Sequence, residues 1–263
     1  TQELAQALGY DMRYESAAQI MDEIAELTPT FRNVSFRFLD EVGSVQWPCN
    51  EAAPTGTPVI AVQDGTVFYA GDDIGALFGP TSNFYGNVIV IQHDFVSPGT
   101  GEPVFSLYGH LSSVEVTEGQ RVIQGDEIGR VGAAGVALGP HLHFEVRVGD
   151  PTSYASTRNP ELWIRPYRGY GTLSGRITDV GGNLLYDVTL DVVSATDTSF
   201  RRAAFSYADD TVNGDTRYGE NFTLGDLPAD YYNLAIRSGG STLYRDQIYL
   251  YPNRTTWLEI HLP

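Results

Sequence analysis

Gly139-Pro-His-Leu-His-Phe-Glu-Val-Arg147 is the stretch from which both the fold and the chemistry of this chain can be read. Its second half is predicted to be a β-strand over residues 143–148. Successive side chains of a strand point to opposite faces, so His141 and His143 are expected to share one face, about 6–7 Å apart. Two imidazoles at that spacing can hold a metal ion and a bound water. The motif therefore predicts metal-assisted hydrolysis on a β scaffold.

The sequence around this motif alternates apolar with polar residues or forms short apolar runs, with glycines between them. This pattern is typical of short strands joined by tight turns. Residues 119–126 are predicted to form an edge strand between two glycine turns, and residues 166–171 a linker. The predicted strands of this segment are 58–61, 65–70, 87–92, 104–111, 121–123, 127–131 and 143–148.

The remainder of the chain, from about residue 171, has the pattern of a second β domain. Turn signals such as Gly181-Gly182-Asn183 separate alternating strands, which suits a small sandwich. The predicted strands are 172–178, 188–195, 221–224, 231–237, 243–250 and 255–262.

The first 47 residues have a helical pattern instead. Ser16 is a candidate N-cap with Gln19 three residues later, and Ile20, Ile24 and Leu27 form one apolar stripe. About fifty residues make a poor core on their own. The predicted fold class is therefore mainly β: a β-sheet domain and a C-terminal β-sandwich, preceded by a short helical extension.

The composition narrows the possible partners. The chain of 263 residues has 33 acidic and 16 basic side chains, all of the latter arginine, and a net charge of −17. Nucleic acids and anionic membrane surfaces require a basic surface, so neither is an expected partner.

No apolar run is long enough to span a bilayer, and no signal peptide is recognised, so a chain that opens at Thr1 fits a mature form or a fragment. Cys49 is the only cysteine, which excludes an internal disulfide and a thiolate zinc cluster.

Five histidines are the candidates for chemistry. His261 is expected at a surface or strand edge, and His93 is expected to make a structural hydrogen bond. His110 ends a predicted strand, as His141 and His143 flank the start of another. Together these three could supply one metal ligand and two groups that orient water and stabilise a developing oxyanion.

Residues from about 52 to 165 resemble the lysostaphin/LytM-type zinc metallopeptidases, which cut peptide cross-links of bacterial peptidoglycan. The resemblance covers somewhat under half of the chain, and it implies an antiparallel β-sheet groove, a zinc ion, peptidoglycan peptides as partners and an extracytoplasmic or secreted location. The motifs that carry it, in the order and spacing of the family, are Ala52-Ala-Pro-Thr-Gly-Thr-Pro-Val59, Asp64-Gly-Thr-Val67, Tyr108-Gly-His-Leu111, Gly125-Asp126, Gly139-Pro-His-Leu-His-Phe-Glu145 and Asn159-Pro-Glu-Leu-Trp163.

Carried over by position, the resemblance makes His143 a zinc ligand, and it makes His110 and His141 the groups that activate water and stabilise the tetrahedral intermediate. The family's other two ligands, a His and an Asp spaced as His-x-x-x-Asp, fall here on Gln46 and Asn50. A neutral amide binds zinc far more weakly than imidazole or carboxylate. We therefore expect zinc to be absent or weakly bound and the chain to be inactive as it stands.

Three alternatives stay open at this point. Cys49 or Glu51, which flank Asn50, could complete a shifted site with His143, and the chain would then be an active zinc endopeptidase. The groove could also persist as a non-catalytic module that binds wall peptides or a partner hydrolase. A third alternative is a fusion product with no selected function.

Two further resemblances complete the predicted domain organisation. Residues 1–51, through Leu8-Gly-Tyr-Asp11 and Val45-Gln-Trp-Pro-Cys-Asn50, are similar to a stretch of molybdopterin-dependent formate dehydrogenase catalytic subunits, which motivates the fusion hypothesis. Residues 169–263 are similar to carboxypeptidase regulatory-like or prealbumin-like sandwiches. The predicted domains are therefore 1–51, 52–168 with the peptidase-like motifs, and 169–263.

Overall fold

The structure is a computed structural model that describes Ser16, residues 19–20, 55–75 and 77–263. The predicted zinc-ligand positions Gln46 and Asn50, their neighbours Cys49 and Glu51, and most of the predicted N-terminal extension lie outside these residues. Within the extension, the Gln19 backbone N–H donates to Ser16 Oγ at 3.3 Å, which is the contact expected of the predicted N-cap.

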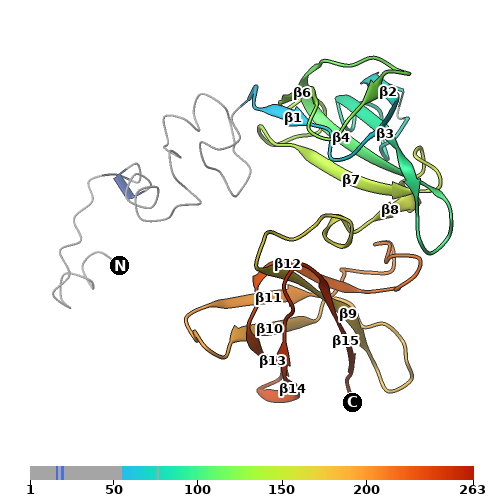
Figure 1. Ribbon diagram of the computed structural model, residues 1–263. Helices are drawn as coiled ribbons and strands as arrows, with labels where there is room; N and C mark the ends of the chain where they lie inside the picture. Colours follow the sequence, from blue (N-terminus) through green and yellow to red (C-terminus); the bar gives the residue numbers. More distant parts are fainter. Residues whose placement is uncertain (1–15, 17–18, 21–54, 76) are drawn as a thin grey trace. The chain divides into compact units, whose positions relative to one another are not determined.

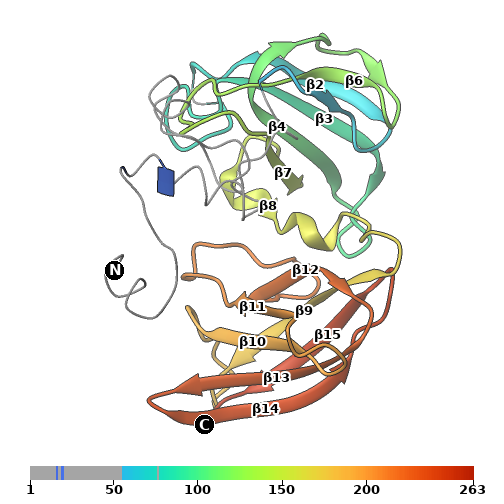
Figure 2. The ribbon, with the colours of Figure 1, turned by 90° about the vertical axis from the view of Figure 1, so that its left-hand side faces the viewer.

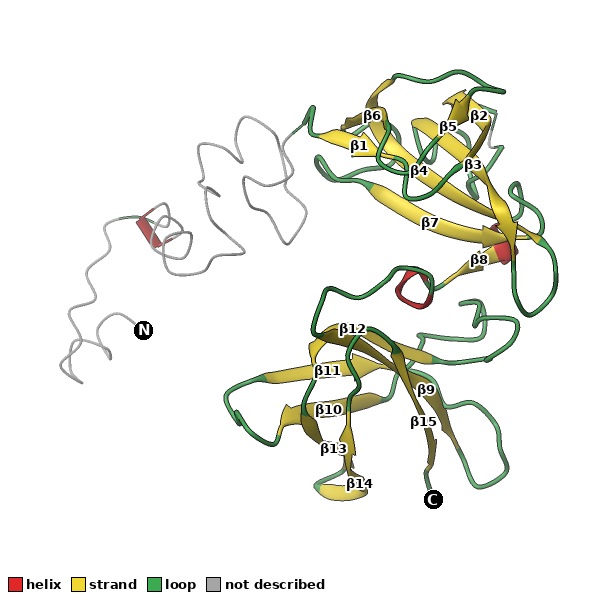
Figure 3. Cartoon of the chain, in the orientation of Figure 1, coloured by secondary structure: helices red, strands yellow, loops and turns green. Residues whose placement is uncertain are grey.

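The described chain is mainly β, as predicted (Figure 3). It divides into two compact units, one containing the chain up to Asp94 with Ser106–Phe144, the other Phe95–Phe105 with Glu145–Pro263. No helix within the described residues is long and apolar enough to cross a membrane. The predicted boundaries 52–168 and 169–263 stay predictions.

Eight strands form the first sheet, which carries the candidate site residues His110 and His143 (Figure 1). The order of its main path is β1-β6-β4-β3-β2-β5, and β7 pairs with β4 and with β8. The short strand β5 is at the end of this path, as the predicted edge strand requires. The strands are β1 Pro58–Ile60, β2 Gly65–Asp72, β3 Asn87–Val96, β4 Pro103–Val114, β5 Arg121–Val122, β6 Glu127–Val131, β7 His143–Val148 and β8 Thr157–Arg158.

The apolar runs of the sequence explain why β3 and β4 are central. Val88, Ile89, Val90 and Ile91 of β3 are all fully buried, which fits a strand covered on both faces. Leu111 of β4 is buried beside them and belongs to the same core cluster as Ile89 and Ile91. The most buried part of the sheet is therefore the part from which the site residue His110 projects.

Two sheets form the C-terminal β-sandwich (Figure 2). One has the order β11-β10-β13-β14, the other β12-β9-β15, and β15 runs parallel to β9. Inward-facing residues of both sheets share one core that includes Leu173, Val192, Leu234 and Ile260. The strands are β9 Tyr170–Thr178, β10 Thr189–Ser194, β11 Arg201–Phe205, β12 Phe222–Pro228, β13 Tyr231–Ser238, β14 Ser241–Tyr249 and β15 Thr255–His261.

The structure corrects the sequence prediction at β11. The sequence Arg201-Arg-Ala-Ala-Phe205 has no β-branched residue and no clear alternation, so it carries little local strand signal. It is a strand because all five of its residues pair with β10 and because it buries Ala204 in the core. Strand β8 and the 3-10 turns η2 Tyr154–Ser156 and η3 Pro160–Leu162 were also not predicted, and β9 begins within the predicted linker.

Candidate active site

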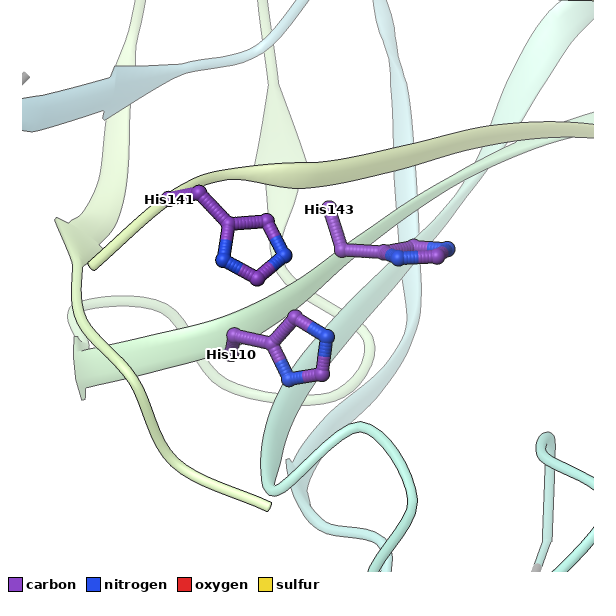
Figure 4. A group of neighbouring side chains, drawn as sticks. All are labelled: His110, His141 and His143. Atoms are coloured by element: carbon purple, nitrogen blue, oxygen red, sulfur yellow. The ribbon is translucent and has the colours of Figure 1, made fainter. Parts of the chain in front are cut away.

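Three imidazoles meet on the sheet that carries the Gly139–Arg147 motif (Figure 4). The ligand nitrogens of His110, His141 and His143 all lie within 4.8 Å of one another. The ring centroids of His110 and His141 are 4.7 Å apart, and those of His110 and His143 are 5.3 Å apart. His110 is buried, while the other two are half-buried. The structure thus brings together the three histidines predicted from the sequence.

The way in which they meet differs from the prediction. Strand β7 begins only at His143, and His141 precedes it in an isolated bridge to Gly132. Strand alternation alone therefore does not place His141. His110 lies within β4 rather than at its end, with a left-handed backbone φ of 61° that is uncommon outside glycine. Such a backbone conformation persists only where the surrounding structure holds it.

Tyr85 provides much of the surrounding structure that maintains this backbone conformation of His110. Its carbonyl oxygen accepts a hydrogen bond of 2.7 Å from the His110 backbone N–H, and its ring packs edge-on at 5.0 Å from His143. A Cβ atom at Gly109 would lie 3.0 Å from the Tyr85 ring, so a larger residue there would push the ring away. Gly109 of the Tyr-Gly-His-Leu motif therefore allows the close contact that positions His110.

Asp73 is the support that the sequence reading missed. Its carboxylate is fully buried and accepts hydrogen bonds from the backbone N–H groups of Leu77, Phe78 and Tyr85. These bonds tie the loop after β2 to Tyr85, which lies two residues before β3. The only signal in the sequence is an acidic residue directly after a strand, which is common at turns and carries no functional meaning by itself.

A second loop determines which ring nitrogen of His110 carries the proton in the neutral form. Its Nδ1 lies 2.8 Å from the Ala134 carbonyl oxygen, which can only accept, so Nδ1 carries the proton. That carbonyl is held in place because Gly135, at φ 78°, packs directly against Gly86. A Cβ on Gly135 would lie 2.4 Å from the Gly86 nitrogen, so no other residue fits without movement.

The neutral forms of His110 and His141 both leave Nε2 unprotonated. His141 Nδ1 lies 2.9 Å from the Gly139 carbonyl oxygen and therefore donates to it. Burial lowers the pKa of His110, and the charges of His141 and His143 lower it further, while the bond to Ala134 opposes this. The net lowering of the pKa of His110 favours its neutral form, which can accept a proton.

The cluster also fits a divalent metal ion. Histidine ligands of zinc commonly donate their second ring N–H to a backbone carbonyl, as His110 and His141 do. Three histidines and a water form a known type of catalytic zinc site. Among the residues that the structure describes, no carboxylate or thiolate joins this group.

The other two histidines have structural surroundings, as predicted. His93 is buried, with Nδ1 3.1 Å from the Asp64 carbonyl oxygen and Nε2 3.0 Å from Ser106 Oγ. His261 is exposed on β15, with Nδ1 2.7 Å from Thr178 Oγ1. Neither belongs to the three-histidine cluster.

His93 makes the stability of the protein sensitive to acid. Burial lowers its pKa from the ordinary value of 6.5, so below that pH the unfolded chain binds a proton that the folded chain resists. Its contribution to the free energy of unfolding is therefore complete above pH 6.5 and is lost as the pH falls through its folded pKa. In urea denaturation between pH 8 and pH 5, we expect His93→Gln to lose less stability than the unmodified chain. Equal losses in the two proteins would contradict this assignment.

Comparison with known proteins agrees with the motif. Residues 49–155 match the family model described as Peptidase family M23. Residues 49–155 carry an M23 peptidase domain. The matched range contains all three histidines of the cluster, and it begins at Cys49, downstream of Gln46. The resemblance to lysostaphin/LytM-type peptidases predicted for residues 52–165 is thus confirmed as an M23 peptidase match over residues 49–155.

Curated relatives match over the same M23 segment. Cell division protein DipM of Caulobacter vibrioides is 39% identical over 98 residues, which are 37% of this chain and 14% of that protein. DD-carboxypeptidase/endopeptidase Mpg of Neisseria meningitidis is 39% identical over 110 residues, 41% of this chain and 22% of that protein. The match thus spans less than a quarter of either relative. The solved catalytic domain of lysostaphin from Staphylococcus simulans is 30% identical over 40% of this chain and 68% of that chain, with a TM-score of 0.33.

Proposed function

We propose that this protein acts outside the cytoplasm on peptidoglycan peptides through its M23 domain, with its catalytic imidazoles in place and its zinc site weakened. The observation that carries the proposal is the convergence of His110, His141 and His143 within 4.8 Å inside the matched segment. The similarity to relatives named as a carboxypeptidase/endopeptidase supports a peptide substrate.

The imidazoles would move the protons of peptide hydrolysis. Neutral His110 and His141 each offer an unprotonated Nε2 that can accept a proton from an attacking water. An imidazole that has accepted this proton becomes a donor at the same atom, so it can stabilise the oxyanion that forms on the carbonyl. It can then return the proton to the leaving amine. The Ala134 and Gly139 carbonyl oxygens keep both rings oriented throughout.

His143 would hold the zinc ion, which when bound lowers the pKa of a water and polarises the peptide carbonyl. The remaining expected ligand positions carry the amides of Gln46 and Asn50. Amide oxygens bind zinc weakly, so one imidazole is left to retain the ion. In the proposed state the chain therefore binds wall peptides, alone or beside a partner hydrolase, and turns them over poorly.

A second candidate function is favoured by the geometry of the cluster itself. If all three histidines bind one ion, the site needs neither Gln46 nor Asn50, and the chain is an active zinc endopeptidase. In that case none of the three rings would be left to act as the base, and another group would have to take the proton of the attacking water.

Zinc content, turnover and binding of the purified chain together test the proposal. We expect much less than one equivalent of zinc, no measurable cleavage of a wall stem peptide or pentaglycine, and saturable sedimentation with purified peptidoglycan. One equivalent of zinc with turnover would replace the proposal by the second candidate. If the chain takes up no zinc and does not bind peptidoglycan, both candidate functions are contradicted and the fusion product is favoured.

A further inference from the structure

The outer face of the four-stranded sheet β11-β10-β13-β14 contains a hollow of about 280 Å³ (sheet in Figure 2). The opposite face of this sheet contributes Leu190, Val192, Leu234 and Ile236 to the core of the sandwich. The hollow is therefore on the side of the sheet that the core does not use. It is lined by Asp191, Val193, Arg201, Asn233, Leu234, Ala235, Arg237 and Arg245.

The floor of the hollow is set by a small residue. Ala235 of β13 lies on the outer face, opposite Asp191 on one side and Arg245 on the other. It is nevertheless only 7% exposed, so longer side chains around it cover it. A small side chain between long ones leaves a depression with flexible polar walls.

The walls are strongly basic for this protein. Three of its sixteen basic residues, Arg201, Arg237 and Arg245, line the hollow with Asp191 as the one acid, although the net charge of the chain is −17. Arg237 is ion-paired with Asp191. The excess positive charge therefore belongs to Arg201 and Arg245, which come from the two outermost strands of the sheet.

Both of these guanidinium groups keep donors for a ligand. Arg201 uses Nε to donate to the Thr198 carbonyl oxygen at 3.2 Å, which leaves its terminal N–H groups. Arg245 makes no side-chain hydrogen bond or ion pair with the described residues. Asn233 accepts from Gln247 Nε2 through Oδ1 at 2.9 Å, so its own amide N–H groups can also donate into the hollow.

We propose that this hollow binds an oxyanionic group, a carboxylate or a phosphate. Arginine presents planar pairs of N–H donors that match both groups, and such charge-assisted bonds are stronger than neutral ones. The other acidic residues of the chain repel an anionic ligand, but at physiological salt this repulsion is largely screened beyond about 8 Å. The free carboxylates of wall peptides are the natural source of such a group. This identification rests on the proposed function, but the proposal of an oxyanion site does not.

Nuclear magnetic resonance of the full chain tests the site directly. The probes are N-acetylglycylglycine, its C-terminal amide and inorganic phosphate, and the signals are the arginine Nε–Hε resonances. We expect saturable shifts with the free acid or with phosphate, but none with the amide. The variant Arg201→Gln with Arg245→Gln should bind the better probe at least about tenfold more weakly, the loss expected for one charge-assisted bond.

The matched control is Arg217→Gln with Arg254→Gln. It removes the same charge from exposed arginines of the same unit that do not line the hollow, so binding should be unchanged. Tighter binding of the acid identifies peptide carboxylates as the source, and tighter binding of phosphate identifies phosphate esters; both support an oxyanion site. No saturable shift, or equal weakening in the control, would overturn it. The experiment needs neither zinc nor turnover, so its failure is distinct from failure of the proposed function.

Discussion

Replacing Gln46 by His and Asn50 by Asp together is expected to raise the zinc affinity of this chain at least about 100-fold. The two substitutions restore the ligand types that the M23 resemblance places at these positions. Even the loss of an outer hydrogen-bond partner costs a metal site about 10–100-fold in affinity, and a direct ligand contributes at least as much. Zinc titration against a competing chelator measures the gain, and cleavage of a stem peptide should appear with it.

Two variants make the zinc result specific. Adding His143→Ala to the double substitution should abolish the gain, because His143 is the third proposed ligand. Adding His261→Ala should leave it intact, since that exposed side chain lies outside the cluster. A folded double variant that takes up no more zinc than the original would show that residues 46 and 50 do not reach His143.

Replacing Arg147 by Met is expected to destabilise the protein by about 3–5 kcal/mol, the usual cost of removing one partner of a buried ion pair. The Arg147 side chain is fully buried and contacts the nearly buried Glu145 through Nε at 2.8 Å and through Nη2 at 2.7 Å. Its Nη1 also donates to the Pro151 carbonyl oxygen at 2.8 Å. The substitution therefore removes three charge-assisted contacts from a buried carboxylate and a carbonyl. Urea denaturation measures the change.

The double variant Glu145→Gln with Arg147→Met separates loss of the charge pair from loss of packing. It should recover part of the stability, because the buried negative charge is removed together with the positive charge that Arg147 supplies. Arg121→Met is the exposed counterpart, since Arg121 pairs with Asp94 and both side chains are about half exposed. Its unfolding midpoint should barely move. Equal effects of Arg147→Met and Arg121→Met would refute the role given to burial.

The strands show what local pattern can and cannot predict. The apolar run of β3 and the alternation of β13 predict those strands, because a strand that buries one or both faces must carry that pattern. Strand β11 has no such pattern, and it exists because β10 offers it a pairing edge. The hollow on the same sheet was not predicted either. Its arginines come from three strands, and only the pairing register brings them to one place.

The sequence alone pointed to His110, His141 and His143, within the motifs of a β protein, as the side chains proposed to carry the chemistry. It did so because residue type and strand pattern are local properties. The orientation of these side chains depends on contacts that exist only in the folded chain. His110 takes its protonation from the Ala134 carbonyl, 24 residues away, and its support from the backbone of Tyr85. Such contacts depend on strand pairing and loop packing across the sheet, which no local pattern of residues contains.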